Sequence, residues 1–294
     1  MSPPEPAARL SAPTVLRVEV GLVENVCSLI CDAATATCAL VDPAFEVDRL
    51  LRTVDEHSLR VGAVLLTHGH LDHIEGVPEL LRRLGPLPVY VGTGEVDAVA
   101  GLCAQAGLEL TDELQPLAGD GTLTVGGLTV QVLATPGHTQ AGRSYYVPAL
   151  GALVPGDTLF VGSVGRPRTL ADAAVLWRSL MRLCDELPED TRVYPGHDYG
   201  PTKTTTIGRE REENPYLRCP DAAAFTALAT CFQGPCNDAC VPKSECNPIT
   251  NAPCNTGAGE ACDLNSNGVF SCFQPPNDAM NCATCSNSSG PFCH

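Results

Sequence analysis

The chain has 294 residues, a formal net charge of -16 and an isoelectric point near 4.7. Binding to nucleic acid or to an anionic membrane surface needs clustered Lys and Arg, so this charge argues against both functions. The length is sufficient for one large domain with its own core and a smaller appendage.

Residues 1–14 are rich in Pro and Ala, and we expect them to be disordered. They lack the apolar core of about 7 to 15 residues that a secretory signal peptide requires. No apolar run approaches the roughly 20 residues needed to cross a bilayer. The sequence therefore predicts a soluble, cytoplasmic protein with no membrane span, and the many cysteines near the C-terminus leave export by another route open.

Residues 15–228 alternate between strand and helix patterns, which predicts an α/β domain. Apolar runs such as VLRVEV, CALVDP, VGAVLLTH and LPVYVG end in Gly, Pro, Asp or His, or close to them, as strands do before functional loops. Apolar residues at helical spacing predict helices over 46–57, 76–84, 94–106 and 172–186.

Five of the seven histidines follow apolar runs, and an aspartate follows another. These residues are His68, His70 and His73 in THGHLDH, His138 in ATPGHT, His197 in YPGHDY, and Asp157 in LVPGDTLF. Imidazole nitrogens and carboxylate oxygens are ligands of zinc, iron and manganese. The H-x-H-x-D-H spacing can serve two adjacent ions, with a further carboxylate as a bridge. The alternative, unrelated turns at strand ends, is disfavoured by the number of motifs.

The motifs THGHLDH, TPGHT, GDTLF and YPGHDY, in this order, resemble the metallo-β-lactamase superfamily, specifically its glyoxalase II and persulfide dioxygenase branch. The resemblance covers residues 15–217 and implies an αββα sandwich with the metal site at one edge. It also implies two sets of ligands joined by a bridging carboxylate. These are His68, His70 and His138 for one metal, Asp72, His73 and His197 for the second, and Asp157 between them.

A binuclear centre of this kind implies hydrolysis of a thioester such as S-lactoylglutathione. Two divalent ions, zinc with iron or manganese as alternatives, lower the pKa of a water and supply hydroxide as the nucleophile. Asp72 and Asp157 are then the catalytic carboxylates. The alternative is a persulfide dioxygenase that oxidises glutathione persulfide, with one Fe(II) held by His68, His138 and Asp157.

Arg143, Arg166 and Tyr199 are candidates for binding a small, thiol-derived substrate. Arg166 matches the Arg of the G-R-T-D-F run that is typical of persulfide dioxygenases, but Arg168 replaces the acidic residue of that run. The shifted glycine in GHTQAGR places Arg143 near the expected mouth of the site. Arginines suit an anionic substrate, although solvated loop charge is an equal alternative for Arg143 and Arg168. Tyr199 flanks His197.

Residues 229–294 form a Cys-rich, core-poor tail, with ten of the 16 cysteines between residues 231 and 294. Such a segment is held by disulfides or metals, or it is disordered. It stands where long glyoxalase II enzymes carry a helical domain that binds glutathione. A further alternative is a surface or binding protein in which this tail carries the main role. A dimer is compatible with the sequence, which leaves the oligomeric state open.

Overall fold

The computed structural model describes residues 9–21 and 24–230, together with the backbone of 261–264 and 270–273. Of the tail predicted over 229–294, the structure describes only residues 229–230, at the end of a helix, and two short strands that pair with each other, β13 (Ala261–Leu264) and β14 (Phe270–Phe273). None of the described helices is long and apolar enough to cross a membrane.

Six strands form the first sheet, in the order of the chain. They are β1 (Thr14–Val20), β2 (Asn25–Asp32), β3 (Thr37–Val41), β4 (Arg60–Leu65), β5 (Val89–Gly92) and β6 (Leu114–Leu117). The first three are antiparallel, and β3 to β6 are parallel. The connections contain α1 (Val47–Glu56), α2 (Leu71–Ile74), α3 (Val77–Leu84), the 3-10 helix η1 (Thr93–Glu95) and α4 (Val96–Gln105).

The second sheet has the order β12-β11-β10-β9-β8-β7, and its neighbours are antiparallel except for β10 and β11. Its strands are β7 (Gly121–Val125), β8 (Leu128–Ala134), β9 (Arg143–Val147), β10 (Ala152–Gly156), β11 (Arg192–Pro195) and β12 (Thr205–Thr206). The helices of this half are η2 (Pro148–Leu150), α5 (Leu170–Glu186), α6 (Ile207–Glu213) and α7 (Ala222–Thr230).

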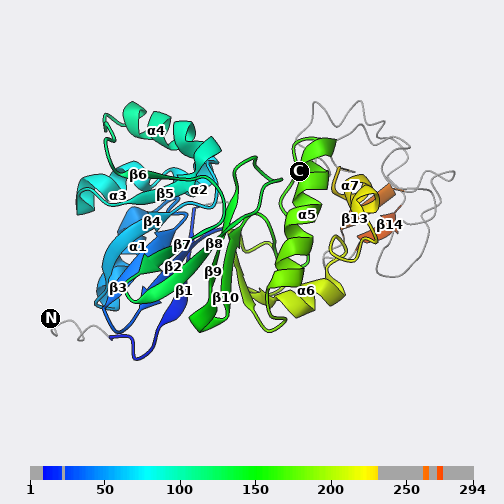
Figure 1. Ribbon diagram of the computed structural model, residues 1–294, viewed down its shortest axis with the longest axis horizontal. Coiled ribbons are helices and arrows are strands. Elements are labelled where there is room, and N and C mark those ends of the chain that lie inside the picture. Colours follow the sequence, from blue (N-terminus) through cyan, green and yellow to red (C-terminus); the bar gives the residue numbers. More distant parts are fainter. Residues whose placement is uncertain (1–8, 22–23, 231–260, 265–269, 274–294) are drawn as a thin grey trace.

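The two sheets pack face to face between two layers of helices (Figure 1). Because successive side chains of a strand point to opposite faces, each strand contributes to two cores. On β2, Leu29 packs with the helices outside the first sheet and Ile30 packs between the sheets. On β10, Leu153 packs against α5 and Val154 packs between the sheets. The αββα sandwich is thus confirmed.

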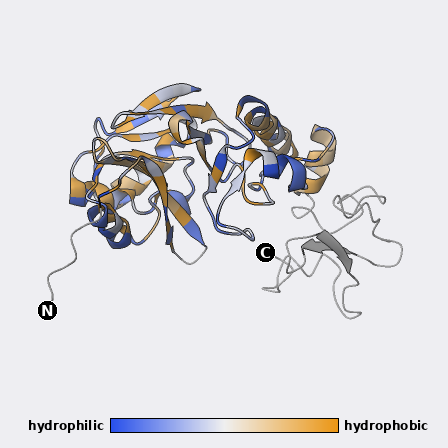
Figure 2. Cartoon of the chain, turned by 90° about the horizontal axis from the view of Figure 1, so that it is seen from below, coloured by the Kyte–Doolittle hydropathy of each residue, from blue (hydrophilic) through white to orange (hydrophobic). Residues whose placement is uncertain are grey.

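Hydropathy along the strands follows the same two-residue period. On β8, buried and exposed residues alternate over the first half of the strand, and Figure 2 shows orange and blue alternating along several elements. β2 and β10 are buried throughout, since each of their faces is covered. Burial along a strand therefore depends on whether one face or both faces of the strand are covered in the sandwich.

Three cysteines of the first hairpin, Cys27, Cys31 and Cys38, are free and fully buried. Cys31 lies opposite Cys38 in the β2–β3 register. Burial raises the pKa of each of these two thiols to about 12, so they stay protonated and pack as small apolar groups.

A buried hydrogen bond joins the second sheet to the end of β4. The Tyr145 hydroxyl donates to the Leu66 carbonyl over 2.7 Å. Replacing Tyr145 with Phe leaves that carbonyl unpaired, so we expect the free energy of unfolding in urea to fall by about 1–3 kcal/mol. The control is Tyr146→Phe, since Tyr146 points to the other face of β9 and packs in the α5 core. Equal losses in the two variants would contradict this role of the hydroxyl.

Candidate metal centre

The seven predicted metal ligands all follow strands, and the structure brings them together at one edge of the sandwich. They are His68, His70, Asp72 and His73 after β4, His138 after β8, Asp157 after β10, and His197 after β11. His73 and His197 are almost completely buried, whereas Asp72 is partly exposed. The site is therefore closed on the protein side and accessible near Asp72.

A close approach of the two sheets sets Asp157 beside the histidine motif. Gly156 has a φ of +53°, and a Cβ atom there would lie 2.2 Å from Oγ1 of Thr67. Only glycine combines this conformation with this contact at no steric cost. The glycine thus lets the end of β10 reach the residue that precedes His68.

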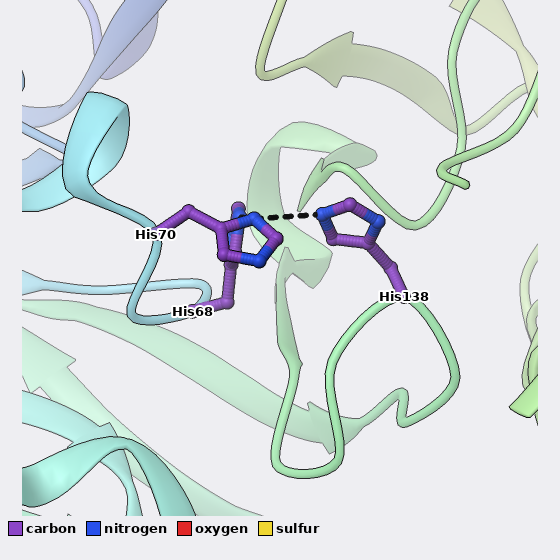
Figure 3. Close-up of side chains that lie close together, drawn as sticks. All are labelled: His68, His70 and His138. Carbon is purple, nitrogen blue, oxygen red and sulfur yellow. Dashed lines mark hydrogen bonds between the residues drawn. The ribbon is translucent and has the colours of Figure 1, made fainter. Parts of the chain in front are cut away.

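The first group of ligands contains three histidines that point toward one another (Figure 3). Nε2 of His68 lies 2.9 Å from Nδ1 of His70, and Nε2 of His138 lies 3.1 Å from the same Nδ1. The Nδ1 of His138 faces the Arg166 carbonyl at 2.9 Å, which leaves Nε2 directed into the group. Three imidazole nitrogens on one point are a suitable zinc or iron site.

The second group contains Asp72, His73 and His197. Nε2 of His73 lies 3.2 Å from Nε2 of His197, and Oδ2 of Asp72 lies 3.5 Å from the latter atom. One nitrogen or oxygen from each residue falls within 4.8 Å of the others. This group therefore has the spacing and the atoms to hold a second ion.

Asp157 lies between the two groups. Its Oδ1 is 3.4 Å from Nε2 of His73, and its Oδ2 is 3.6 Å from Nε2 of His138 and 3.5 Å from Nε2 of His197. Oδ1 is buried and accepts no hydrogen bond, a costly state for a carboxylate unless a cation balances it. The residues present therefore fit a pair of divalent ions with Asp157 between them.

The protonation of the first group suits metal binding. Burial lowers the pKa of His68, His70 and His138, and with the neighbouring imidazoles it outweighs the opposing charge of Asp157. These histidines are thus neutral, which is the form that binds a metal.

Charges oppose burial at the second group. Burial acts to lower the pKa of His73, but Asp157 and Asp42 outweigh it and raise that pKa well above its usual value. Burial acts to raise the pKa of Asp157, but His73 and His197 outweigh it and lower that pKa. Asp157 is therefore ionised and available to a cation.

Two residues that the sequence analysis missed orient the second group. Asp42 accepts hydrogen bonds from the Thr67 amide at 2.7 Å and the Thr67 hydroxyl at 2.6 Å, and lies 3.0 Å from Nδ1 of His73. Since its oxygens are occupied in this way, Asp42 orients His73 rather than serving as a ligand. Asn25 donates to the carbonyl of Asp72 at 2.8 Å and to its Oδ2 at 3.2 Å. The signal for Asp42 was its place at the end of the CALVDP run, whereas Asn25 had none.

We expect Asp42→Asn to weaken zinc binding about 10–100-fold, the usual loss when a group that orients a metal-bound histidine is changed. Oδ1 of Asp42 accepts from the Thr67 amide while Oδ2 faces the Thr67 hydroxyl and His73, and the single oxygen of an amide side chain cannot occupy both positions. Competition with a chromogenic chelator measures the affinity. Asp55→Asn, at an exposed position of α1, is the control and should bind zinc as the native chain does. Unchanged affinity in Asp42→Asn would contradict the orienting role.

The three predicted substrate contacts have different positions. Tyr199 stacks on His197, with ring centroids 4.5 Å apart, and is 55% exposed. Arg166 has an exposed side chain, and its carbonyl faces His138. The expectation for Arg143 is corrected by the structure, because its guanidinium is buried and donates to the carbonyls of Ala141, Gly142 and Leu117. Arg143 therefore supports the backbone around β9 instead of facing a substrate. Arg168 is exposed.

The motifs that carry the ligands lie within a stretch that matches a known family. The family model of the Metallo-beta-lactamase superfamily matches residues 20–197 of this chain. The chain belongs to the metallo-beta-lactamase superfamily. Its relatives include a hydroxyacylglutathione hydrolase of Methylobacterium sp. (strain 4-46), which is 30% identical over 70% of this chain and 87% of that protein.

Solved structures of the superfamily share the fold. The crystal structure of ETHE1 from Myxococcus xanthus is 30% identical, with a TM-score of 0.64, and the match covers 76% of this chain and 92% of that chain. TTHA1623 in a di-iron-bound form is 32% identical, with a TM-score of 0.55, and the match covers 69% of this chain and all (100%) of that chain. The metallo-beta-lactamase fold thus extends over most of the described residues.

Proposed function

We propose that this protein is a metal-dependent hydrolase that cleaves a thioester such as S-lactoylglutathione at a binuclear centre. The observation that carries the proposal is the position of Asp157, which lies between two complete groups of three ligands. Zinc is the proposed metal, with iron or manganese as alternatives, because all three accept imidazole and carboxylate ligands. A relative called hydroxyacylglutathione hydrolase supports the proposed thioester substrate, and a solved structure in a di-iron-bound form supports a site for two metals.

When bound, the two ions supply a nucleophile from water at neutral pH and polarise the carbonyl of the substrate. Residues around the metal groups would bind and orient the substrate. Tyr199 is 55% exposed beside His197. Partial desolvation of its ring, together with the negative charges of Asp157 and Asp72, raises the pKa of its hydroxyl to about 12. This hydroxyl therefore stays protonated and can donate a hydrogen bond to the substrate.

Positive charge near the site supports an anionic thiol carrier as the leaving group. Arg166 and Arg168 have exposed side chains in the segment whose backbone contacts His138, on a chain with a net charge of -16. A guanidinium binds a carboxylate through two parallel hydrogen bonds. We propose that these arginines bind the carboxylates of a glutathione-like substrate.

The test is the loss of thioester absorbance when the zinc-loaded protein is mixed with S-lactoylglutathione. We expect hydrolysis by the zinc-loaded protein and none after treatment with a chelator, and zinc added back should restore the rate. No turnover by protein that holds two zinc ions would contradict this substrate.

Persulfide dioxygenation is the second candidate, because two histidines of the first group and the Asp157 carboxylate have the ligand types of a one-iron site. His68 and His138 belong to the first group, and Oδ2 of Asp157 lies 3.6 Å from Nε2 of His138. This set is typical of Fe(II) oxygenases. Oxygen uptake by Fe(II)-loaded protein given glutathione persulfide, with sulfite as product, would favour it over the hydrolase.

A further inference from the structure

The loop of residues 158–169, which joins β10 to α5, contacts a ligand of each metal group. The Arg166 carbonyl lies 2.9 Å from Nδ1 of His138. The ring of Phe160 meets the ring of His197 at a centroid distance of 6.0 Å. At Gly165, an added Cβ would lie 1.7 Å from the Asp157 carbonyl oxygen and 3.0 Å from the His138 ring. The position of this loop therefore sets the surroundings of both groups.

A tight turn in the 158–169 loop is tied to α6 by two side chains. The turn is closed by a hydrogen bond from the Phe160 amide to the Ser163 carbonyl, 3.0 Å long, and Gly162 has a φ of +72°. Oε2 of Glu210, in α6, accepts from the Gly162 amide at 2.9 Å. The side-chain amide of Asn214 donates to the Ser163 carbonyl at 3.1 Å and to Oε2 of Glu210 at 2.8 Å.

Glu210 on α6 and Asn214 directly after the helix are both buried, whereas the other charged residues of α6 are exposed. Glu210 is 2% exposed and Asn214 is fully buried (0%), whereas Glu212 is exposed. Burial raises the pKa of Glu210. A buried carboxylate costs stability that an apolar side chain would not, and its contacts here go to Asn214 and to the backbone of the loop. Burying Glu210 thus lowers the stability of the fold, and its hydrogen bonds hold the backbone of the loop in place.

We propose that Glu210 and Asn214 are positioning residues that hold the 158–169 loop against His138 and His197 and so set the geometry of both metal groups. The two side chains fix the Gly162 amide and the Ser163 carbonyl. These groups in turn fix the neighbouring Phe160 and Arg166, which contact His197 and His138. This inference rests on the metal centre of the proposed function.

The test uses Co²⁺, whose visible absorption reports the geometry of its ligands. In Glu210→Ala we expect cobalt binding to weaken about tenfold or more, as for other groups that orient metal ligands, and the absorption bands to shift. Glu210→Gln keeps a carbonyl oxygen that can accept both hydrogen bonds, so its affinity and spectrum should match those of the native chain. Glu212→Ala, on the same helix, is the matched control and should also match them.

A lowered melting temperature in Glu210→Ala, with native cobalt affinity and spectrum, would overturn the inference and leave a purely structural role. If Glu210→Ala does not fold, Asn214→Asp carries the test, because it removes the donor to the Ser163 carbonyl and to Glu210 but keeps the oxygen that accepts from the Tyr216 amide. A native spectrum and affinity in that variant would overturn the inference equally. A native chain that binds no cobalt would instead contradict the metal centre itself, so the two failures are distinguishable.

Discussion

Replacing Asp157 with Ala is expected to remove both metals and to lower kcat/KM for the thioester by about a thousandfold or more. Asp157 has one oxygen near His73 and the other near His138 and His197, so its loss affects both groups at once. Several kcal/mol of transition-state stabilisation depend on the ions, and each 1.36 kcal/mol is about a factor of ten in rate.

Metal content after dialysis and hydrolysis of S-lactoylglutathione measure the effect of Asp157→Ala. The control is Asp190→Ala, which changes an exposed carboxylate before β11 and should keep both metals and full activity. The more conservative Asp157→Asn keeps the shape of the side chain but not its charge. Full metal content in Asp157→Asn would show that the charge between the groups is not needed, contrary to the proposal.

Most of the fold could be predicted because local patterns agree with tertiary packing. The helix expected over 172–186 is α5 (Leu170–Glu186), and the helix expected over 46–57 is α1 (Val47–Glu56). In α5, Leu176, Leu180 and Leu183 have the helical spacing of a core-facing side and are buried in the core. The N-terminal difference at α5 reflects its cap, since Oγ1 of Thr169 accepts from the Asp172 amide, which apolar spacing does not reveal.

The candidate ligands can be picked out in the sequence, whereas the residues that orient them cannot. Each ligand lies in a short motif that follows an apolar run, so its type and place are visible in the sequence. Asp42 meets His73 across 31 positions, and Glu210 meets Gly162 across 48. Pairings over such distances depend on how the sheets and helices pack. The expectation for Arg143 failed for the same reason: its guanidinium donates to the carbonyl of Leu117 in β6, which belongs to the other sheet, and the sequence does not show how the two sheets pack.

Replacing Asp72 with Ala is expected to separate the two candidate reactions. Asp72 belongs only to the second group, where its Oδ2 lies 3.5 Å from Nε2 of His197, and Asn25 orients it. Its loss should reduce bound metal from about two ions per chain to about one and lower hydrolysis about 100-fold or more, because a two-metal mechanism needs both ions. Glu75→Ala, at the exposed end of α2, is the control and should change neither quantity.

The first group should survive in Asp72→Ala, since His68, His70 and His138 contact one another without Asp72. A dioxygenase with one iron held by His68, His138 and Asp157 would therefore keep its metal and its oxygen uptake with glutathione persulfide. Retained iron together with retained uptake would contradict the hydrolase proposal. Loss of the second ion in step with loss of thioester hydrolysis would instead tie the activity to the pair of ions, because the variant leaves every ligand of the first group in place.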